Sequence, residues 1–324
     1  MRIWKRVVIG AAAPLVAGAG LVGIHLKRFE DRLVRVDGDP ARGFHWPYYL
    51  YVSPGAEERA ARAETVRLLV LPNNTGHPDD DFEVHRRAAW LRMLRDREVA
   101  DGLGVAALVP IFPRPRANWR VYTHALDRDS LTTEIEDLAR PDLQLLAMIE
   151  DARRRLADRG WTVGERVLLR GFSANGMFSN RFAALHPEKV LAVAAGSPGG
   201  WPIAPASEWK GKTLRYPVGI ADLEALTGRA FDLEAFSRVP ILIFMGDRDE
   251  NDSVPFGDGY DEEDRDLVFE TFGRTPVERW PASEETYRAA GTSARFRLDP
   301  GVGHEVSDET EQAVRDFLRR ALEE

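Results

Sequence analysis

From about residue 44 onward, two kinds of segment alternate along the chain. Short runs rich in valine, isoleucine, leucine and aromatic residues are bounded by turn residues, a pattern typical of β-strands. These runs are FHWPYYLYVSP, TVRLLVLP, GVAALVPIFP, RVLLRGF, KVLAVAAGS, VPILIFMGD and ARFRLDP. Charged amphipathic stretches between them predict crossover helices at 81–99, 131–159, 177–185 and 308–322. The alternation predicts an α/β fold with a mostly parallel sheet.

The most apolar runs show how that sheet is covered. LLVL, ILIF and VLAVAA are hydrophobic at every position rather than at every second one. Such strands are buried on both faces, so we predict a doubly wound sheet with helices on each side. Residues 198–237, rich in Pro, Gly and Trp, interrupt the rhythm just before the strand VPILIFMG. They predict a cap-like insertion, with an ordinary surface excursion as the alternative.

The N-terminal segment has a different character. Residues 7–26 contain no formal charge, and as a helix they would span roughly 30 Å, the thickness of a bilayer core. The basic sequence MRIWKR precedes them, and the small residues AGA at 17–19 are suited to a signal peptidase. Residues 1–28 are therefore predicted to be a signal peptide or an N-terminal membrane anchor of an exported protein. Cleavage and anchoring both remain open, and a buried helix is the alternative.

Composition limits the classes of binding partner and of cysteine chemistry that this chain can have. The 324 residues carry 44 Lys and Arg against 52 Asp and Glu, a formal net charge of −8, with no basic stripe. A nucleic-acid partner is therefore not expected, and contact with a membrane is expected only through the N-terminal segment. The absence of cysteine excludes disulfides, thiol nucleophiles and cysteine-based zinc sites. With 44% hydrophobic residues, 29–324 has enough apolar content for one large domain.

The clearest chemical signal is RVLLRGFSANG. An apolar strand leads into Ser173 on a sharp turn, and a segment able to form a helix follows at once. A serine on such a turn has a strained backbone and an exposed hydroxyl, as a nucleophile requires. Asn175 stands where the pattern G-x-S-x-G has its second glycine; we attribute this to the tolerance of Asn for left-handed backbone. The alternative is that Ser173 only caps the helix.

A serine hydroxyl needs a histidine base, and that base needs a carboxylate to orient it. Of the seven histidines, His304 lies on a glycine-flanked loop between the last predicted strand and the C-terminal helix. Asp249 follows the strand VPILIFMG with G-x-x-D spacing and is the preferred acid, with Asp247 and Asp252 as the other candidates. A calcium loop over 247–258 is disfavoured, because its sixth position is not Gly and no Glu closes it.

The order of these motifs resembles the α/β-hydrolase superfamily. GFSANG, then GDRD after a buried strand, then GVGH before the last helix, occur over a region from Phe44 to the C-terminus. The run MFSNRF followed by HPEKV and AAGSPGG resembles bacterial esterases related to polyester depolymerases and feruloyl esterases. The resemblance implies Ser173 as nucleophile, His304 as general base and then acid, and Asp249 as the residue that orients the imidazole.

Acyl transfer also needs donors for an oxyanion. The backbone amide of Ala174 heads the helix and is the first candidate. The superfamily places its second donor after an earlier strand, which implies Asn74, with Asn73 as its neighbour; an ordinary Asn-Gly loop is the alternative. The acidic run at 79–81, followed by His85, is better explained by a helix N-terminus than by a metal.

Together these features predict an exported serine hydrolase that cleaves a small-molecule or polymeric carboxylic ester through an acyl-enzyme. No metal and no organic cofactor are expected. Within 198–237, Trp201 is the predicted wall of the acyl pocket. A serine peptidase or thioesterase of the same fold remains an alternative, because a triad is common to them all. The other alternative is a noncatalytic binding protein with a hydrolase fold.

Overall fold

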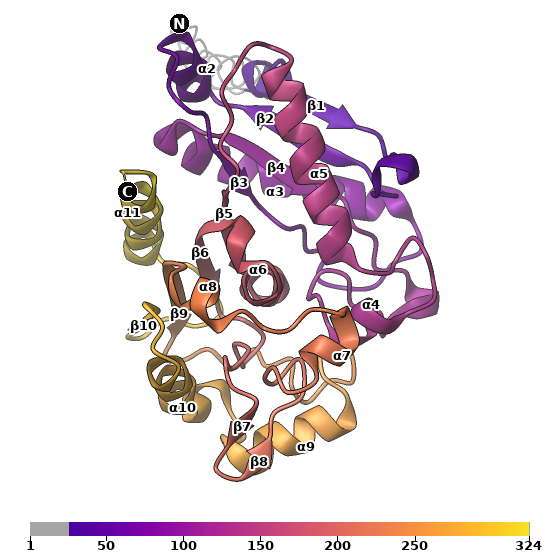
Figure 1. The fold of residues 1–324 in the computed structure, drawn as a ribbon, viewed down its shortest axis with the longest axis vertical. Helices are drawn as coiled ribbons and strands as arrows, with labels where there is room; N and C mark the ends of the chain where they lie inside the picture. The colour runs from indigo at the N-terminus through magenta and orange to yellow at the C-terminus, as the bar shows by residue number, and fades with distance from the viewer. Residues whose placement is uncertain (1–25, 324) are drawn as a thin grey trace, which may run out of the picture.

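An eight-stranded mixed sheet runs through the computed structural model, which describes residues 26–323 (Figure 1). Its strands are β1 (Leu33–Val36), β2 (Tyr48–Val52), β3 (Leu68–Val70), β4 (Ala106–Pro110), β5 (Val167–Phe172), β6 (Val190–Gly196), β9 (Ile241–Gly246) and β10 (Arg295–Asp299). They lie in the order β1-β2-β4-β3-β5-β6-β9-β10. Strand β2 is antiparallel to both of its neighbours, and the strands from β4 to β10 are parallel.

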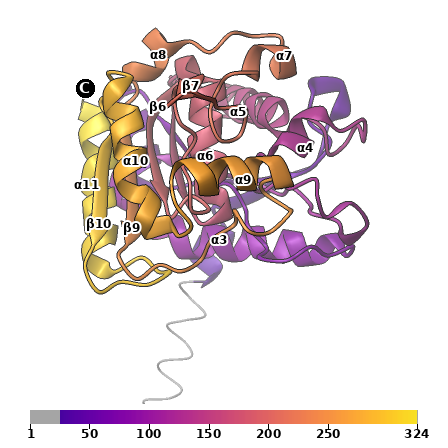
Figure 2. The same ribbon diagram turned by 90° about the horizontal axis from the view of Figure 1, so that it is seen from below.

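Helices cover both faces of this sheet, and the views in Figures 1 and 2 show α3 and α5 on opposite sides. The helices are α2 (Pro54–Ala61), α3 (Phe82–Leu103), α4 (Arg128–Thr132), α5 (Pro141–Ala157), α6 (Ala174–Leu185), α7 (Leu223–Thr227), α8 (Leu233–Ser237), α9 (Glu262–Thr271), α10 (Pro276–Ala289) and α11 (Asp308–Glu323). Helices α3 and α11 pack on one face, and α5, α6 and α10 pack on the other. The predicted doubly wound α/β fold is confirmed.

Two details differ from the sequence-based expectation. The predicted helix over 131–159 is two helices. Helix α4 ends at Thr132, and α5 begins at Pro141 because proline disfavours helical backbone at the preceding Arg140, whose φ is 50°. Strand β1 was not predicted; it is only four residues long and pairs antiparallel with β2 at the sheet edge. The predicted leader, 1–28, lies almost wholly outside the described residues. None of the helices within 26–323 is long and apolar enough to cross a membrane.

The parallel strands end at one edge of the sheet, and the polar loops that follow them gather there. Residues 73–76 follow β3, Ser173 follows β5, Asp249 comes three residues after β9, and His304 comes five residues after β10. In open α/β sheets this carboxyl edge is where ligands bind. The fold thus brings together residues that are up to 231 positions apart in the sequence, from 73 to 304.

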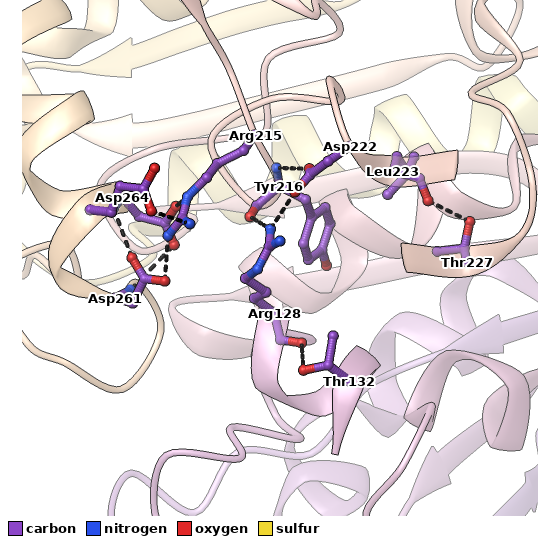
Figure 3. Close-up of polar contacts among 10 residues, drawn as sticks. Arg128, Thr132, Arg215, Tyr216, Asp222, Leu223, Thr227, Asp261 and Asp264 are labelled. Carbon is purple, nitrogen blue, oxygen red and sulfur yellow. Dashed lines mark hydrogen bonds and ion pairs between the residues drawn. The ribbon is translucent and has the colours of Figure 1, made fainter. Parts of the chain in front are cut away.

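Residues 198–237 run from that edge over the face of the sheet that carries α5 and α6, and they return to the start of β9. They contain a short hairpin of β7 (Glu208–Trp209) and β8 (Lys212–Thr213), followed by α7 and α8. Charged residues bind the segment 198–237 to α4 and α9, as Figure 3 shows. Arg215 pairs with Asp261 and Asp264 at the start of α9. Arg128 of α4 donates to the Tyr216 carbonyl (2.9 Å) and to Asp222 (2.6 Å). The segment is therefore held on the molecule by polar contacts as well as by packing.

Candidate active site

Ser173 occupies a one-residue turn between β5 and α6. Its φ of 63° and ψ of −132° lie where an L-amino acid is strained, so neighbouring contacts must impose the conformation. One such contact is the hydrogen bond from the Ser173 N–H to the Gly196 carbonyl, at 2.9 Å. The predicted arrangement of strand, sharp turn and helix is confirmed. Its side chain does not cap α6, so the capping interpretation fails.

Two glycines allow the turn to be this tight. A Cβ atom on Gly171 would lie 2.0 Å from the backbone oxygen of Asn175, and one on Gly176 would lie 2.4 Å from the Gly196 carbonyl oxygen. Asn175 itself is helical, so its expected left-handed backbone is wrong. Only Ser173 within this turn has a positive φ, and Asn175 is present for its side-chain contacts instead.

His304 and Asp249 meet above the carboxyl edge. The Nδ1 atom of His304 lies 2.9 and 3.0 Å from the two carboxylate oxygens of Asp249. The loop that carries His304 approaches β9 very closely, since a Cβ on Gly246 would lie 2.1 Å from the Val302 carbonyl oxygen. The Arg248 N–H donates to that same carbonyl at 2.9 Å. These backbone contacts set the position of the imidazole relative to the carboxylate.

Asp249 is held in its ionised form. Burial by itself would raise the pKa of this fully covered carboxyl, but hydrogen bonds from His304 and from the Asn251 N–H outweigh it and lower the pKa. A carboxylate that accepts from Nδ1 leaves Nε2 of the same ring as the available base. The side chain of His304 is 27% exposed, so the ring is open to an incoming molecule.

Phe172 contacts His304 and is bonded to Ser173, so it places the two residues in the same part of the site. The rings of Phe172 and His304 pack with centroids 4.8 Å apart, and Phe172 directly precedes Ser173. In the described residues no hydrogen bond links the Ser173 hydroxyl to His304. Such contacts commonly tighten only when substrate is bound. Sequence reasoning did not single out Phe172, because nothing in a strand pattern indicates which ring lies beside it.

The competing aspartates have other partners. Asp247 accepts from the Gly301 N–H at 2.6 Å, and Asp252 forms a two-point ion pair with Arg279 at 2.7 and 2.9 Å. Three carboxylates close in sequence therefore serve three different partners, which argues against the calcium-loop interpretation. Within 26–323 no group of three acidic or histidine side chains is arranged to hold a metal ion. In the 79–81 run, Asp81 caps α3 as expected of a helix N-terminus.

The predicted oxyanion donors lie at the ends of β3 and β5. Ala174 is the first residue of α6, and the hydrogen bonds of the described chain include no acceptor for its N–H or for that of Asn74. Asn73 has a structural place, since its buried side chain binds both backbone groups of Phe112. The Asn74 side chain accepts from the Gly76 N–H at 3.0 Å, which shapes the loop. Both backbone amides thus remain available as donors.

Trp201 does not lie where sequence reasoning expected it. Its side chain is 1% exposed, and its ring stacks on Phe272 with centroids 3.9 Å apart. The indole N–H donates to the Val218 carbonyl at 2.8 Å, and the Tyr260 hydroxyl donates to the Trp201 carbonyl. A ring enclosed on these sides has no free face for an acyl chain. The prediction of a pocket wall is therefore wrong for this residue, although the ring belongs to the apolar cluster that includes Ala174.

By sequence, the chain matches no protein-family model and no curated protein. By structure, it is similar to poly(aspartic acid) hydrolase-1 from Sphingomonas sp. KT-1, with a TM-score of 0.54, 16% identity, and 83% of this chain and 92% of that one covered. It is also similar to a poly(3-hydroxybutyrate) depolymerase from Bordetella parapertussis, with a TM-score of 0.52, 20% identity and 88% of each chain covered. The chain has the α/β-hydrolase fold.

The strand order and the placement of Ser173 after the fifth strand of this α/β-hydrolase fold agree with the resemblance seen in the sequence. At 16% and 20% sequence identity the similarity concerns the fold, and the chemistry depends on the residues at the site. Those residues form a strained serine, a histidine hydrogen-bonded to a buried carboxylate, and two backbone amides that have no acceptor within 26–323, all at one edge of the sheet.

Proposed function

We propose that this protein is a serine hydrolase that cleaves a carboxylic ester through an acyl-enzyme. The observation that carries the proposal is the placement of Ser173, in a strained turn, at the same sheet edge as the hydrogen-bonded pair of His304 and Asp249. Strain of this kind persists only where surrounding contacts impose it, and it occurs most often at functional sites. The alternative of a noncatalytic binding protein gives no reason for it.

The proposed reaction has two halves. In the first, His304 Nε2 takes the proton of the Ser173 hydroxyl as Oγ attacks the ester carbonyl carbon. The N–H groups of Ala174 and Asn74 donate to the oxygen that becomes negative, and Asp249 stabilises the charged imidazole. His304 then returns the proton to the departing alkoxide, so that an alcohol leaves. In the second half, His304 takes a proton from the water that attacks the acyl-enzyme and gives it to Ser173 Oγ as the acyl bond breaks, so that the carboxylic acid is released.

The names of the two similar structures suggest a class of substrate. One is called a poly(aspartic acid) hydrolase and the other a poly(3-hydroxybutyrate) depolymerase. We therefore propose that a polymeric substrate be tried beside small esters.

The test begins with a fluorophosphonate probe and a series of 4-nitrophenyl esters of increasing acyl length. We expect labelling at Ser173 together with turnover of at least the short esters. Ser173→Ala should lose both, His304→Ala should lose most turnover, and the double variant should lose little more, because the residues act as a unit. Labelling without ester turnover would favour the peptidase or thioesterase alternative. Absence of labelling in the folded protein would contradict a serine hydrolase of any kind.

We also propose that the protein is exported through its N-terminal segment. The support is the basic start and the uncharged run at 7–26. Residues 1–28 fused to alkaline phosphatase, which is active only after export, should give activity in a bacterial host. A fusion lacking 7–26 is the control. Equal activity in the two fusions would contradict the proposal.

A further inference from the structure

The side chain of Asn175 lies buried between the ends of two neighbouring strands. It is 3% exposed, its Oδ1 accepts from the Phe172 N–H at 2.5 Å, and its Nδ2 donates to the Pro72 carbonyl at 2.8 Å. Phe172 ends β5, and Pro72 comes two residues after β3. One amide group therefore joins the segment that leads to Ser173 to the segment that leads to Asn74.

The backbone leaves a gap that this amide fills. Pairing of β3 with β5 ends at Val70 and Leu169, and Pro72 has no N–H with which to extend it. The Ser173 N–H is directed to β6, where it binds Gly196, so the Phe172 N–H points the other way, toward β3. Buried backbone groups need partners, and Asn175 supplies one to each strand. The side chain thus connects the two strand ends where no backbone hydrogen bond does.

We propose that Asn175 is a positioning residue that sets the spacing of the two oxyanion donors. Its two partners, Phe172 and Pro72, each stand two residues before a proposed donor, Ala174 and Asn74. This inference rests on the proposed hydrolase function and deepens it. It explains why the position after Ala174 holds an amide side chain rather than the small residue of the G-x-S-x-G pattern. Asn175 acts through the backbone and makes no contact with substrate.

The same helix contains a matched control. Asn180 is 0% exposed, donates to the Tyr287 hydroxyl at 2.8 Å and accepts from the Ile203 N–H at 2.9 Å. Like Asn175, it is a buried amide of α6 with one donor bond and one acceptor bond. Its partners, however, lie away from the loop that carries Asn74. Loss of either side chain removes two buried hydrogen bonds, but only the loss of Asn175 releases the loop that carries Asn74.

The experiment compares Asn175→Ala with Asn180→Ala, using 4-nitrophenyl butyrate. We expect kcat of Asn175→Ala to fall roughly 10- to 100-fold with KM changed less than about threefold, because donors shifted by a fraction of an ångström matter mainly in the transition state. Asn180→Ala should keep kcat within about threefold while losing comparable thermal stability. Equal kcat values for the two folded variants would overturn the positioning role.

Asn175→Asp provides a second readout that a purely structural role would not give. The carboxylate keeps the acceptor for Phe172 but repels the Pro72 carbonyl, whereas the protonated acid can donate to it. Burial raises the pKa of such a carboxyl, so the ratio of variant to wild-type kcat should rise several-fold as pH is lowered toward 5.5. The wild type, measured at the same pH values, is the reference for this ratio. A ratio independent of pH would contradict the bridge.

The outcomes separate this inference from the proposed function. Wild-type protein that neither reacts with the fluorophosphonate probe nor turns over ester would remove the function and the positioning role together. Wild-type protein that does both, beside an Asn175→Ala variant labelled at the same rate, would remove the positioning role alone. Amide hydrogen exchange at Phe172 should be faster in Asn175→Ala than in Asn180→Ala, and this measurement needs no activity.

Discussion

At the scale of single residues, the site depends on which partner each aspartate has. Asp249 and Asp252 are three positions apart, yet one faces His304 and the other faces Arg279, whose side chain is 0% exposed. Arg279 also donates to the carbonyls of Gly200, Gly273 and Arg274. A guanidinium buried this deeply needs its carboxylate, so Asp252 has a structural task that is separate from the chemistry.

Substitution of Asp249 should therefore lower activity, whereas substitution of Asp252 should lower stability. Asp249→Asn should lower kcat about 10³- to 10⁴-fold with little change in melting temperature, because it disturbs only the orientation and charge of the imidazole. Asp252→Asn should cost about 3 kcal/mol of stability and keep most of kcat below its melting temperature. Ester kinetics and thermal melts of both variants test this. If Asp252→Asn proved the more damaging to kcat, the acid would be misassigned.

At the scale of elements, the segment 198–237 is anchored by packing as well as by ion pairs. Trp201 stacks on Phe272, which directly follows α9, and its indole binds Val218 within the segment. Helix α4 contributes the contacts of Arg128, as seen in Figure 3. These contacts link the segment 198–237 to helices that come before and after it in the sequence.

Truncation of Trp201 should therefore affect the stability of the fold more than the preference for acyl-chain length. We expect Trp201→Ala to lower the free energy of unfolding by about 3–5 kcal/mol, the usual cost of deleting a large buried aromatic side chain. Trp119→Ala, at a tryptophan that is 40% exposed, should cost less than about 1 kcal/mol. Urea unfolding measures both. A Trp201→Ala variant of normal stability but altered acyl-chain preference would restore the pocket-wall interpretation.

The N-terminus of α4 makes stability depend on pH. Burial, followed by the charge of Asp129, raises the pKa of Asp127 to about 7, while bonds from the Ser130 and Tyr122 N–H groups act in the opposite direction. An unfolded aspartate titrates near 3.9, so between about pH 4 and 7 the folded protein retains a proton that the unfolded chain has released. Stability should therefore fall as the pH rises through this window.

Asp127→Asn should remove that dependence. Its amide oxygen can still accept from the two N–H groups, and Asn caps helices as well as Asp does. Relative to the wild type, the variant should gain on the order of 1–3 kcal/mol between pH 4.5 and 8. Asp232→Asn, at the exposed cap of α8, is the control. Denaturant unfolding at several pH values measures the effect, and parallel curves for wild type and Asp127→Asn would contradict it.

At the scale of the whole molecule, a buried charge network joins the central sheet to one helical layer. Asp96 of α3 pairs with Arg92 on its own helix and with Arg170 of β5, and Arg170 also pairs with Glu311 of α11. Burial lowers the pKa of both arginines to about 10, and both therefore stay charged at neutral pH. Arg170 lies three residues before Ser173, so the network stabilises the strand that leads to the Ser173 turn.

Removal of its central anion should be costly. We expect Asp96→Asn to lower the free energy of unfolding by about 3–5 kcal/mol, because two buried cations lose their shared partner. Glu83→Gln breaks an exposed pair with Arg86 on the same helix and should cost less than about 1 kcal/mol. Added salt should weaken the exposed pair and affect the buried network little. A loss below about 1 kcal/mol for Asp96→Asn, as for the exposed pair, would contradict the stabilising role of the network.

Much of this architecture was predictable from local sequence signals. Continuous apolar runs with turn residues at their ends indicate buried parallel strands, and the serine between an apolar strand and a helix indicates the sharp turn at Ser173. Both signals are readable because they lie within a few neighbouring residues. The order of Ser173, Asp249 and His304 and the glycine-flanked loops likewise predict which residues reach the carboxyl edge. For that reason the sequence alone identified the α/β fold and the two residues that the structure joins, His304 and Asp249.

Only the tertiary structure decided the contacts between segments far apart in the chain. Hydrophobicity predicts that Trp201 is apolar, but whether it lines a pocket or a core depends on Phe272 and Val218. The choice of Asp249 over Asp252 depends on Arg279, and the role of Asn175 depends on Pro72, 103 positions earlier in the sequence. Hydrogen bonds and packing act at contact distance, whereas a sequence pattern reports only the residues beside each other along the chain.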